Sequence, residues 1–302
     1  MAATTTSRRS STKLTIAQPA EDGVNLVGTL EQLDPDAPTQ GRKIALILHG
    51  TMGHKDYLFQ KRLAQNLPLD SFRFDFRGAF ESGGKWKYAA FHEDLEDLRV
   101  VVRHLRETYG YVVDLVVGHS RGSVVGMLWL CTSEEGRDVG GFVNVSGRYR
   151  MDRVLHDHHY KRYKPDFDSK GHFEWEVTVA RQKVIGHITE AEMHEFASID
   201  TSVVWSRFPA KTDALTIHGL ADTVVPVFDA TIYARALGAG REGTHSLCLV
   251  EDGDHNLTGH NDEVVGVILD WWKQHEARAL KSGIWGTGVR PEPSATHKPS
   301  RL

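Results

Sequence analysis

Residues 112–123, Val-Val-Asp-Leu-Val-Val-Gly-His-Ser-Arg-Gly-Ser, decide the fold that we expect for this chain. They begin as a β-branched apolar run, which is typical of a buried strand. They end in the pentapeptide Gly118-x-Ser120-x-Gly122, and a helix-like run, residues 124–131, follows at once. Between a strand and a helix, this pentapeptide predicts a sharp turn that lifts the hydroxyl of Ser120 above the sheet edge. Both glycines are needed there, because a side chain would collide with the neighbouring strand or helix.

Composition restricts the classes of protein to which the chain can belong. Its 302 residues, 40% of them hydrophobic, suffice for one large domain with a buried core. The formal net charge of -4 provides no basic field for nucleic acid. No apolar run approaches the roughly 18 residues of a transmembrane helix, so we expect no membrane partner.

The expected compartment is the cytoplasm. Cys131 and Cys248, the two cysteines, are expected to be reduced core residues. The first residues contain no apolar core of a secretory signal. Arg8 and Arg9, with no acidic residue before Glu21, leave a mitochondrial presequence as the less favoured alternative.

Alternating strand and helix patterns predict an α/β fold with a mostly parallel sheet and helices on both faces. We expect one domain at residues 13–282, with an insertion at about 147–208, between disordered tails at 1–12 and 283–302. The predicted strands are residues 14–18, 24–30, 43–48, 71–76, 112–117, 141–146, 213–219 and 245–250. The predicted helices are residues 57–67, 91–109, 124–131, 228–237 and 264–279.

A serine at a sheet edge needs a base, an orienting acid and an oxyanion hole to act as a nucleophile. Loops that follow later strands of the same parallel sheet can reach that edge. Asp222 follows the strand at 213–219, and His255 follows the strand at 245–250. The chain order Ser120, Asp222, His255 is that of one serine-hydrolase class and differs from the other common orders.

Other acids and histidines fit these roles less well. Asp200 ends no predicted strand, and His260 lies further along, at the start of the last helix. His49, His119 and His218 stand beside glycines at strand ends, where we expect them to shape loops rather than to move protons.

A further group of histidines raises the hypothesis of a metal-binding site. It contains His156, His158 and His159 with Asp152 and Asp157, and its spacing matches no helical ligand pair with a third partner in view. We therefore expect no metal and no other cofactor.

The loop at residues 49–53 follows the strand next to the nucleophile's strand. Its backbone can direct N–H groups at the serine, so we expect the amides of Thr51 and Arg121 to form the oxyanion hole. Four residues are expected to border the substrate pocket: His49, Gly50, Phe80 and His119.

Five motifs in order resemble the α/β-hydrolase superfamily over residues 24–280. They are His49-Gly50 with Gly53, residues 73–78 (Arg-Phe-Asp-Phe-Arg-Gly), residues 118–122, His218-Gly219-x-x-Asp222-Thr223-Val224-Val225, and Gly253-Asp254-His255. Within the superfamily the chain resembles the bacterial cinnamoyl (feruloyl) esterases and their fungal relatives, near the serine aminopeptidase group. The resemblance implies that Ser120 is the nucleophile, His255 the base and acid, and Asp222 the orienting carboxylate.

The resemblance also implies that the insertion at 147–208 forms a cap over the active site. Helical spacing of the apolar residues Phe173, Val177, Ala180 and Val184 predicts a cap helix, and Thr189-x-x-Glu192 predicts a capping box. Arg121 stands where these esterases often have Gln. We expect it either to attract an anionic part of the substrate or to pair with an acid on the elbow helix.

These features predict a serine hydrolase that cleaves small carboxylic esters through an acyl-enzyme. The same triad would also serve an amidase, peptidase, thioesterase or acyltransferase, and a small-molecule receptor is the alternative from another class. The oligomeric state and the physiological substrate are left open.

Overall fold

The computed structural model describes residues 9–238 and 240–287, with the backbone alone at 158, 159 and 284–287. Within these residues, nine strands form one sheet. Their order is β1-β2-β4-β3-β5-β6-β9-β10-β11. From β4 to β11 every neighbouring pair is parallel, whereas β1–β2 and β2–β4 are antiparallel. The strands are β1 (Ser10–Ala17), β2 (Asn25–Gln32), β3 (Lys43–Leu48), β4 (Asp70–Phe74), β5 (Val112–His119), β6 (Gly141–Val145), β9 (Asp213–Gly219), β10 (His245–Val250) and β11 (Ile284–Thr287). The expected mostly parallel sheet is confirmed.

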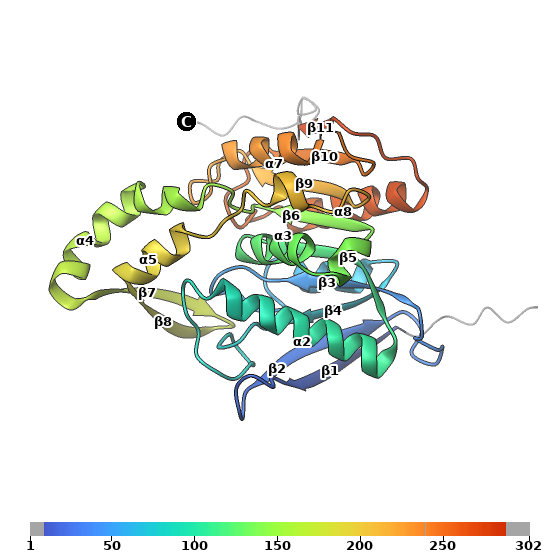
Figure 1. Ribbon diagram of the computed structural model, residues 1–302, viewed down its shortest axis with the longest axis horizontal. Coiled ribbons are helices and arrows are strands. Elements are labelled where there is room, and N and C mark those ends of the chain that lie inside the picture. Colours follow the sequence, from blue (N-terminus) through green and yellow to red (C-terminus); the bar gives the residue numbers. More distant parts are fainter. Residues whose placement is uncertain (1–8, 239, 288–302) are drawn as a thin grey trace, which may run out of the picture.

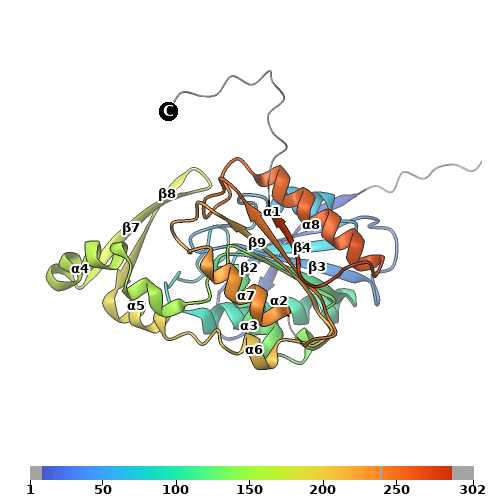
Figure 2. The same cartoon turned by 90° about the horizontal axis from the view of Figure 1, so that it is seen from above.

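Helices cover both faces of this sheet, as Figures 1 and 2 show. On one face lie α2 (Phe91–Tyr109), α3 (Arg121–Thr132), α6 (Val204–Arg207) and α7 (Phe228–Gly238). On the other face lie α1 (Gln60–Asn66) and α8 (Asn261–Glu276). Short 3-10 helices occupy Glu135–Asp138 and Met151–Leu155. Among the described helices none combines the length and the hydropathy that crossing a bilayer requires.

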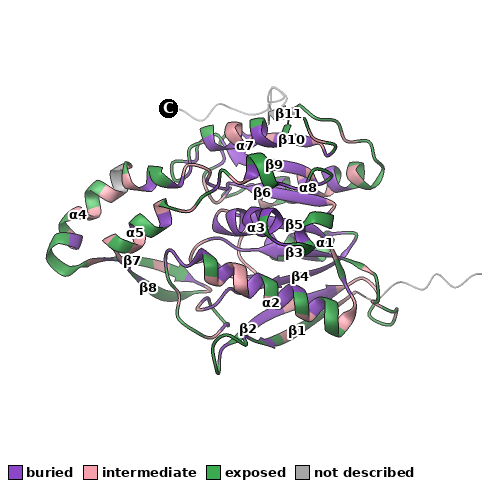
Figure 3. Cartoon of the chain, viewed as in Figure 1, coloured by how far each residue is buried: buried purple, intermediate pink, exposed green. Residues whose placement is uncertain are grey.

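The central strands are apolar at successive positions because each face of the sheet has its own core. Leu46 of β3 and Val116 of β5 belong to the core under α2 and α3, whereas their neighbours Ile47 and Val117 belong to the core under α1 and α8. Figure 3 shows these central strands buried, with much more exposed surface on the segment that projects from the sheet. The strand that precedes Ser120 is therefore held rigidly from both sides.

The segment between β6 and β9 projects from one end of the sheet and forms the cap (Figure 1). It contains α4 (His158–Lys170), β7 (His172–Val179), β8 (Gln182–Thr189) and α5 (Glu190–Ala197). Strands β7 and β8 pair antiparallel as a separate two-stranded sheet. At the start of α5 the predicted capping box is confirmed: the Thr189 side chain accepts from the Glu192 N–H, and the Glu192 side chain accepts from the Thr189 N–H.

The predicted cap helix over residues 173–184 is wrong, because this segment is the β7–β8 hairpin. A spacing of four residues fits a strand as well as a helix, and Phe173 and Val177 share one face of β7. The turn between the strands holds Ala180 at φ 46° and Arg181 at φ 71°. Tight hairpin turns of this hand usually contain Asn or Gly, so the sequence carries no turn signal here.

Both predicted tails include residues that form strands. Strand β1 begins at Ser10, inside the predicted 1–12 tail, and β11 lies inside the predicted 283–302 tail. Each is an edge strand of the sheet, and backbone pairing joins it to β2 or to β10. The remaining tail residues, 1–8 and 288–302, lie outside the described residues.

Candidate active site

Ser120 lies at the sharp turn between β5 and α3. Its backbone has φ 51° and ψ -115°, a conformation that a residue with a side chain rarely adopts. A Cβ on Gly118 would lie 2.4 Å from the Ser123 nitrogen, and one on Gly122 would lie 2.6 Å from the Leu48 carbonyl oxygen. Neither distance leaves room for a side chain, so glycine at both positions allows the tight turn that exposes the serine.

The structure brings Ser120, Asp222 and His255 together from the ends of three strands. His255 Nδ1 lies 2.8 Å from Asp222 Oδ2, and His255 Nε2 lies 2.9 Å from Ser120 Oγ. An ionised carboxylate can only accept hydrogen bonds. Nδ1 of His255 therefore carries the imidazole proton, and its N–H donates a hydrogen bond to Asp222. Nε2 then presents its lone pair to the Ser120 hydroxyl, which is the arrangement that lets a histidine accept the serine proton.

Asp222 is buried and held from several directions. Its Oδ1 accepts hydrogen bonds of 2.8 Å from the amides of Val224 and Val225. Its Oδ2 lies 3.2 Å from His218 Nε2, besides its bond to His255. Burial acts to raise the pKa of Asp222, but the hydrogen bonds from His218 and His255 outweigh it and hold the pKa well below its usual range. The Asp222 carboxylate is therefore charged at neutral pH.

Two further histidines hold the surrounding loops. Burial lowers the pKa of His119 to about 3, so its ring is neutral, and Nε2–H donates to the His255 carbonyl at 3.0 Å. Burial also lowers the pKa of His49. The Nδ1–H of His49 donates to the Gly50 carbonyl at 2.8 Å, and its Nε2 accepts from the Phe76 amide at 3.0 Å. Neither ring contacts Ser120 Oγ or Asp222 through a hydrogen bond.

Two backbone amides beside Ser120 have no hydrogen-bond acceptor among the described residues. They are those of Thr51, in the loop after β3, and Arg121, the first residue of α3. An amide in the first turn of a helix has no intrahelical acceptor. Both residues line the cavity at Ser120, so their N–H groups are available to an oxygen bound there.

A cavity of about 280 Å³ opens at Ser120, between the sheet edge and the cap. Gly50 and His119 border it from the core, and Trp175 and Val177 of β7 with Phe196 of α5 border it from the cap. Of the four residues expected at the pocket, Gly50 and His119 are therefore in place.

The other two predicted pocket residues, His49 and Phe80, do not line this cavity. His49 is buried beneath it by the contacts described above. Phe80 borders an adjoining groove instead, and is 44% exposed. Its ring centre lies 4.9 Å from the centre of the His54 ring and 4.9 Å from the Lys55 ammonium.

Arg121 pairs with an acid, but the acid belongs to α2 and not to the elbow helix. Its Nε donates to Asp94 Oδ2 at 2.5 Å, and its Nη1 donates to the Tyr88 carbonyl. The guanidinium also lies over the Phe91 ring, 4.4 Å from the ring centre. With its charge compensated by Asp94, Arg121 is not the residue that would attract an anionic substrate.

Sequence reasoning missed Arg148, which follows β6 at the start of the cap segment and lines the cavity. A single arginine in a polar segment carries no signal that it turns inward. The competitors weighed for the triad lie elsewhere. Asp200 is exposed and accepts from Ser202, and His260 Nδ1 contacts Glu263 at 2.8 Å.

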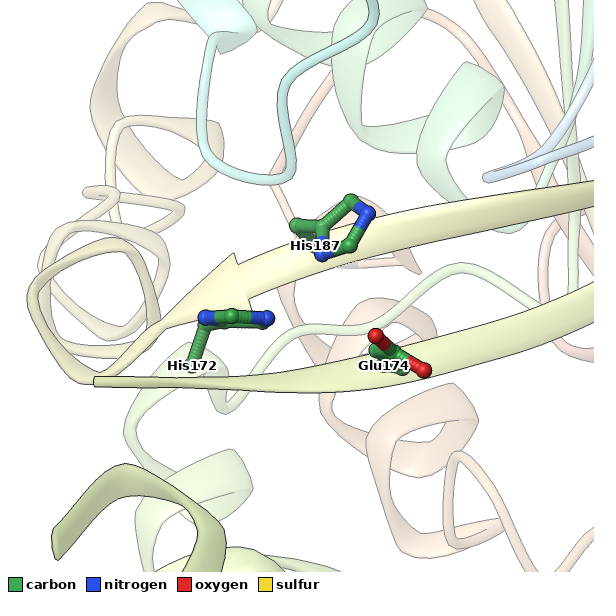
Figure 4. Close-up of side chains that lie close together, drawn as sticks. All are labelled: His172, Glu174 and His187. Carbon is green, nitrogen blue, oxygen red and sulfur yellow. The ribbon is translucent and has the colours of Figure 1, made fainter. Parts of the chain in front are cut away.

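One group of side chains on the cap has the composition of a metal site. His172 and Glu174 of β7 and His187 of β8 place one ligand atom each within 4.8 Å of one another, and Figure 4 shows the three beside the hairpin. Two histidines and a carboxylate are a set that Zn²⁺ accepts. None of the three lines the Ser120 cavity.

The histidines considered from sequence, His156, His158 and His159, form no such group among the side chains that the structure describes. The side chains of His158 and His159 lie outside that description.

Comparison with known proteins decides the family. Residues 39–262 match the family described as serine aminopeptidase, S33. The chain belongs to this family. It is thus a hydrolase of the α/β-hydrolase superfamily, as the five motifs indicated.

A relative in yeast and several solved structures are similar to this chain. The putative uncharacterized protein YDL057W of Saccharomyces cerevisiae is 29% identical over 235 residues, which cover 72% of this chain and 69% of the yeast protein. The chain shares its fold with Est1E of Butyrivibrio proteoclasticus, solved with ferulic acid bound: TM-score 0.68 and 16% identity, over 87% of this chain and 99% of Est1E. The esterase Pf2001 of Pyrococcus furiosus is similar at a TM-score of 0.61 and 18% identity, over 88% of this chain and 90% of Pf2001.

Proposed function

We propose that this S33-family hydrolase cleaves carboxylic esters of small molecules through an acyl-enzyme formed on Ser120. The observation that carries the proposal is the hydrogen-bonded chain from Ser120 Oγ to His255 Nε2 and from His255 Nδ1 to Asp222, with the serine on a strained turn at the cavity floor. An unstrained surface serine beside a histidine would carry far less weight, because backbone strain of this kind is retained mainly at functional sites.

The proposed reaction begins with attack of Ser120 Oγ on the ester carbonyl carbon while its proton passes to His255 Nε2. The amides of Thr51 and Arg121 donate to the oxyanion that forms. His255 then gives the proton to the departing alcohol oxygen, leaving an acyl group on Ser120. Water attacks the acyl carbon, gives a proton to His255, and the acid leaves as Ser120 recovers its proton. The charged Asp222 stabilises the imidazolium at each step.

The cavity supports small substrates. A space of about 280 Å³ roofed by the cap encloses a small acyl group and excludes a folded protein. Tyr57, Tyr88, Phe91, Trp175 and Phe196 contribute aromatic surface to its wall. We therefore propose aryl or short-chain alkyl esters as substrates, and little activity on long-chain triglycerides or proteins.

The decisive experiment is labelling of the folded protein with a fluorophosphonate, followed by a panel of p-nitrophenyl esters, thioesters and peptide amides. A covalent adduct on Ser120, with ester hydrolysis that is lost in Ser120→Ala, is the expected result. An adduct with a clear preference for amides or thioesters would move the assignment to a peptidase or thioesterase with the same triad. No adduct in folded protein would favour a receptor.

A further inference from the structure

The wall of the Ser120 cavity carries positive charge without negative charge. Two arginines, Arg121 and Arg148, are among its described lining residues, and no aspartate or glutamate is. Arg121 is compensated by Asp94. Arg148 has no acidic side chain within ion-pair distance among the residues that the structure describes.

Arg148 is unusual among the buried cationic side chains of the described chain, which are Lys55, Arg73, Arg77, Arg121 and Arg148. The first four each form an ion pair with a buried acid at 2.5 to 2.9 Å. Arg148, 9% exposed, does not. Arginine stays protonated in proteins, and a buried charge is costly unless it is paired. Among the described residues the fold thus leaves one buried cation, Arg148, without an acidic partner, and this residue lines the cavity.

The guanidinium of Arg148 is nevertheless held in place. Its Nη2–H donates to the Val224 carbonyl at 2.6 Å, in the loop that also holds Asp222. Its own carbonyl accepts from the Tyr233 hydroxyl at 3.0 Å. Only this one side-chain hydrogen bond is formed to described residues, out of the five N–H donors that a guanidinium offers. The remaining donors are available to a bound ligand.

We propose that Arg148 binds a carboxylate of the substrate, so that the preferred substrates are small esters that carry a second, free carboxylate. The proposal rests on the ester hydrolysis proposed for Ser120. A planar guanidinium matches a carboxylate with two parallel hydrogen bonds, and such charge-assisted bonds are about twice as strong as neutral ones. The absence of acids from the described cavity wall removes the repulsion that such a substrate would otherwise meet.

The carboxylate can belong to the acyl part or to the leaving alcohol, and two matched pairs of esters distinguish these sources. Monoethyl glutarate is compared with ethyl pentanoate for the acyl side, and 4-acetoxybenzoate with 4-acetoxybenzamide for the leaving side. The quantity measured is kcat/KM for the anionic ester divided by that for its neutral partner. Comparing this ratio between variants cancels the intrinsic reactivity of the two esters.

In at least one pair we expect Arg148→Met to lower the ratio about tenfold to hundredfold, the usual effect of a hydrogen-bonded charge pair. Arg148→Lys, which keeps the charge but not the fork, should recover part of the loss. Arg153→Met is the matched control, because Arg153 lies exposed on the same segment and does not line the cavity. The control should keep the wild-type ratio.

A ratio that Arg148→Met leaves unchanged in both pairs would overturn the proposal. If this variant does not fold, the wild-type protein provides the test, with glutarate against pentanamide for the acyl side and 4-hydroxybenzoate against 4-hydroxybenzamide for the leaving side. In at least one of these pairs the anion should inhibit ester hydrolysis competitively and more strongly than its neutral partner, and equal inhibition within both pairs would refute the proposal. Failure of the underlying function looks different. In that case the wild-type protein hydrolyses none of the four esters, or the Ser120→Ala variant hydrolyses them equally well.

Discussion

The substitution Asp222→Asn tests the proposed mechanism by replacing the carboxylate oxygen that faces His255 with an NH2 group. The Asp222 Oδ1 accepts two backbone hydrogen bonds of 2.8 Å, from Val224 and Val225. An asparagine in the same place has one oxygen and one NH2 group, and its oxygen must face those amides. The reverse orientation would leave buried N–H donors facing another donor, at about 1–3 kcal/mol for each unsatisfied group.

With the oxygen held there, the NH2 group faces His255 at the position of Oδ2. It can only donate, so His255 must accept at Nδ1 and carry its proton on Nε2. The imidazole then presents an N–H to Ser120 and cannot take the serine proton. The tautomer change in such triads lowers kcat about 10⁴-fold, which corresponds to about 5 kcal/mol in the activation free energy.

The assay measures kcat with the best ester of the panel and the rate of fluorophosphonate labelling of Ser120. Circular dichroism and thermal unfolding establish that the variant is folded. Asp200→Asn is the matched control, because Asp200 is exposed and its side chain accepts hydrogen bonds from Ser202 alone among the described residues. If Asp222→Asn keeps kcat within tenfold of wild type, the tautomer argument is wrong. If Asp200→Asn loses activity instead, the acid has been misassigned.

Three further predictions concern stability and metal. Gly122→Ala should unfold the elbow or strongly destabilise the protein, since its Cβ would lie 2.6 Å from the Leu48 carbonyl, and an unchanged melting temperature would contradict this. Burial lowers the pKa of His245 to about 4, which is below its value in the unfolded chain. As the pH drops below about 6.5, the unfolded state therefore binds a proton before the folded state does, and the free energy of unfolding falls. In urea titrations His245→Gln should therefore lose about 2 kcal/mol less than wild type between pH 7 and pH 5, and equal losses would refute the claim. Finally, incubation with EDTA should leave ester hydrolysis unchanged, whereas loss that added Zn²⁺ restores would implicate the group on β7 and β8.

The order of the chain was enough to select Ser120, Asp222 and His255, because each follows a strand that its own apolar pattern reveals. In a parallel sheet the carboxyl ends of strands meet at one edge, so residues far apart in sequence can be brought together by topology alone. The glycines of the elbow could also be interpreted locally, since their role is steric and involves the adjacent turn and strand.

The cap could not be predicted in the same way. The residues from Phe173 to Val184 have a spacing that fits both helix and strand, and the turn at Ala180 and Arg181 uses positive φ angles without glycine or asparagine. The choice of a hairpin there depends on packing, with Phe173 stacked on Tyr163 of α4 at 3.9 Å. Local propensity is a weak guide where tertiary contacts decide between a helix and a strand.

The sequence by itself determined the parallel α/β architecture and the members of the proposed catalytic triad, since both follow from strand order and hydrophobic pattern. Only the tertiary structure decided which side chains face the substrate. It turns Phe80 into a neighbouring groove, pairs Arg121 with Asp94 across two helices, and brings Arg148 unpaired to the cavity wall. The physical reason is that the direction and the charge partner of a side chain depend on residues distant in sequence, which no local pattern encodes.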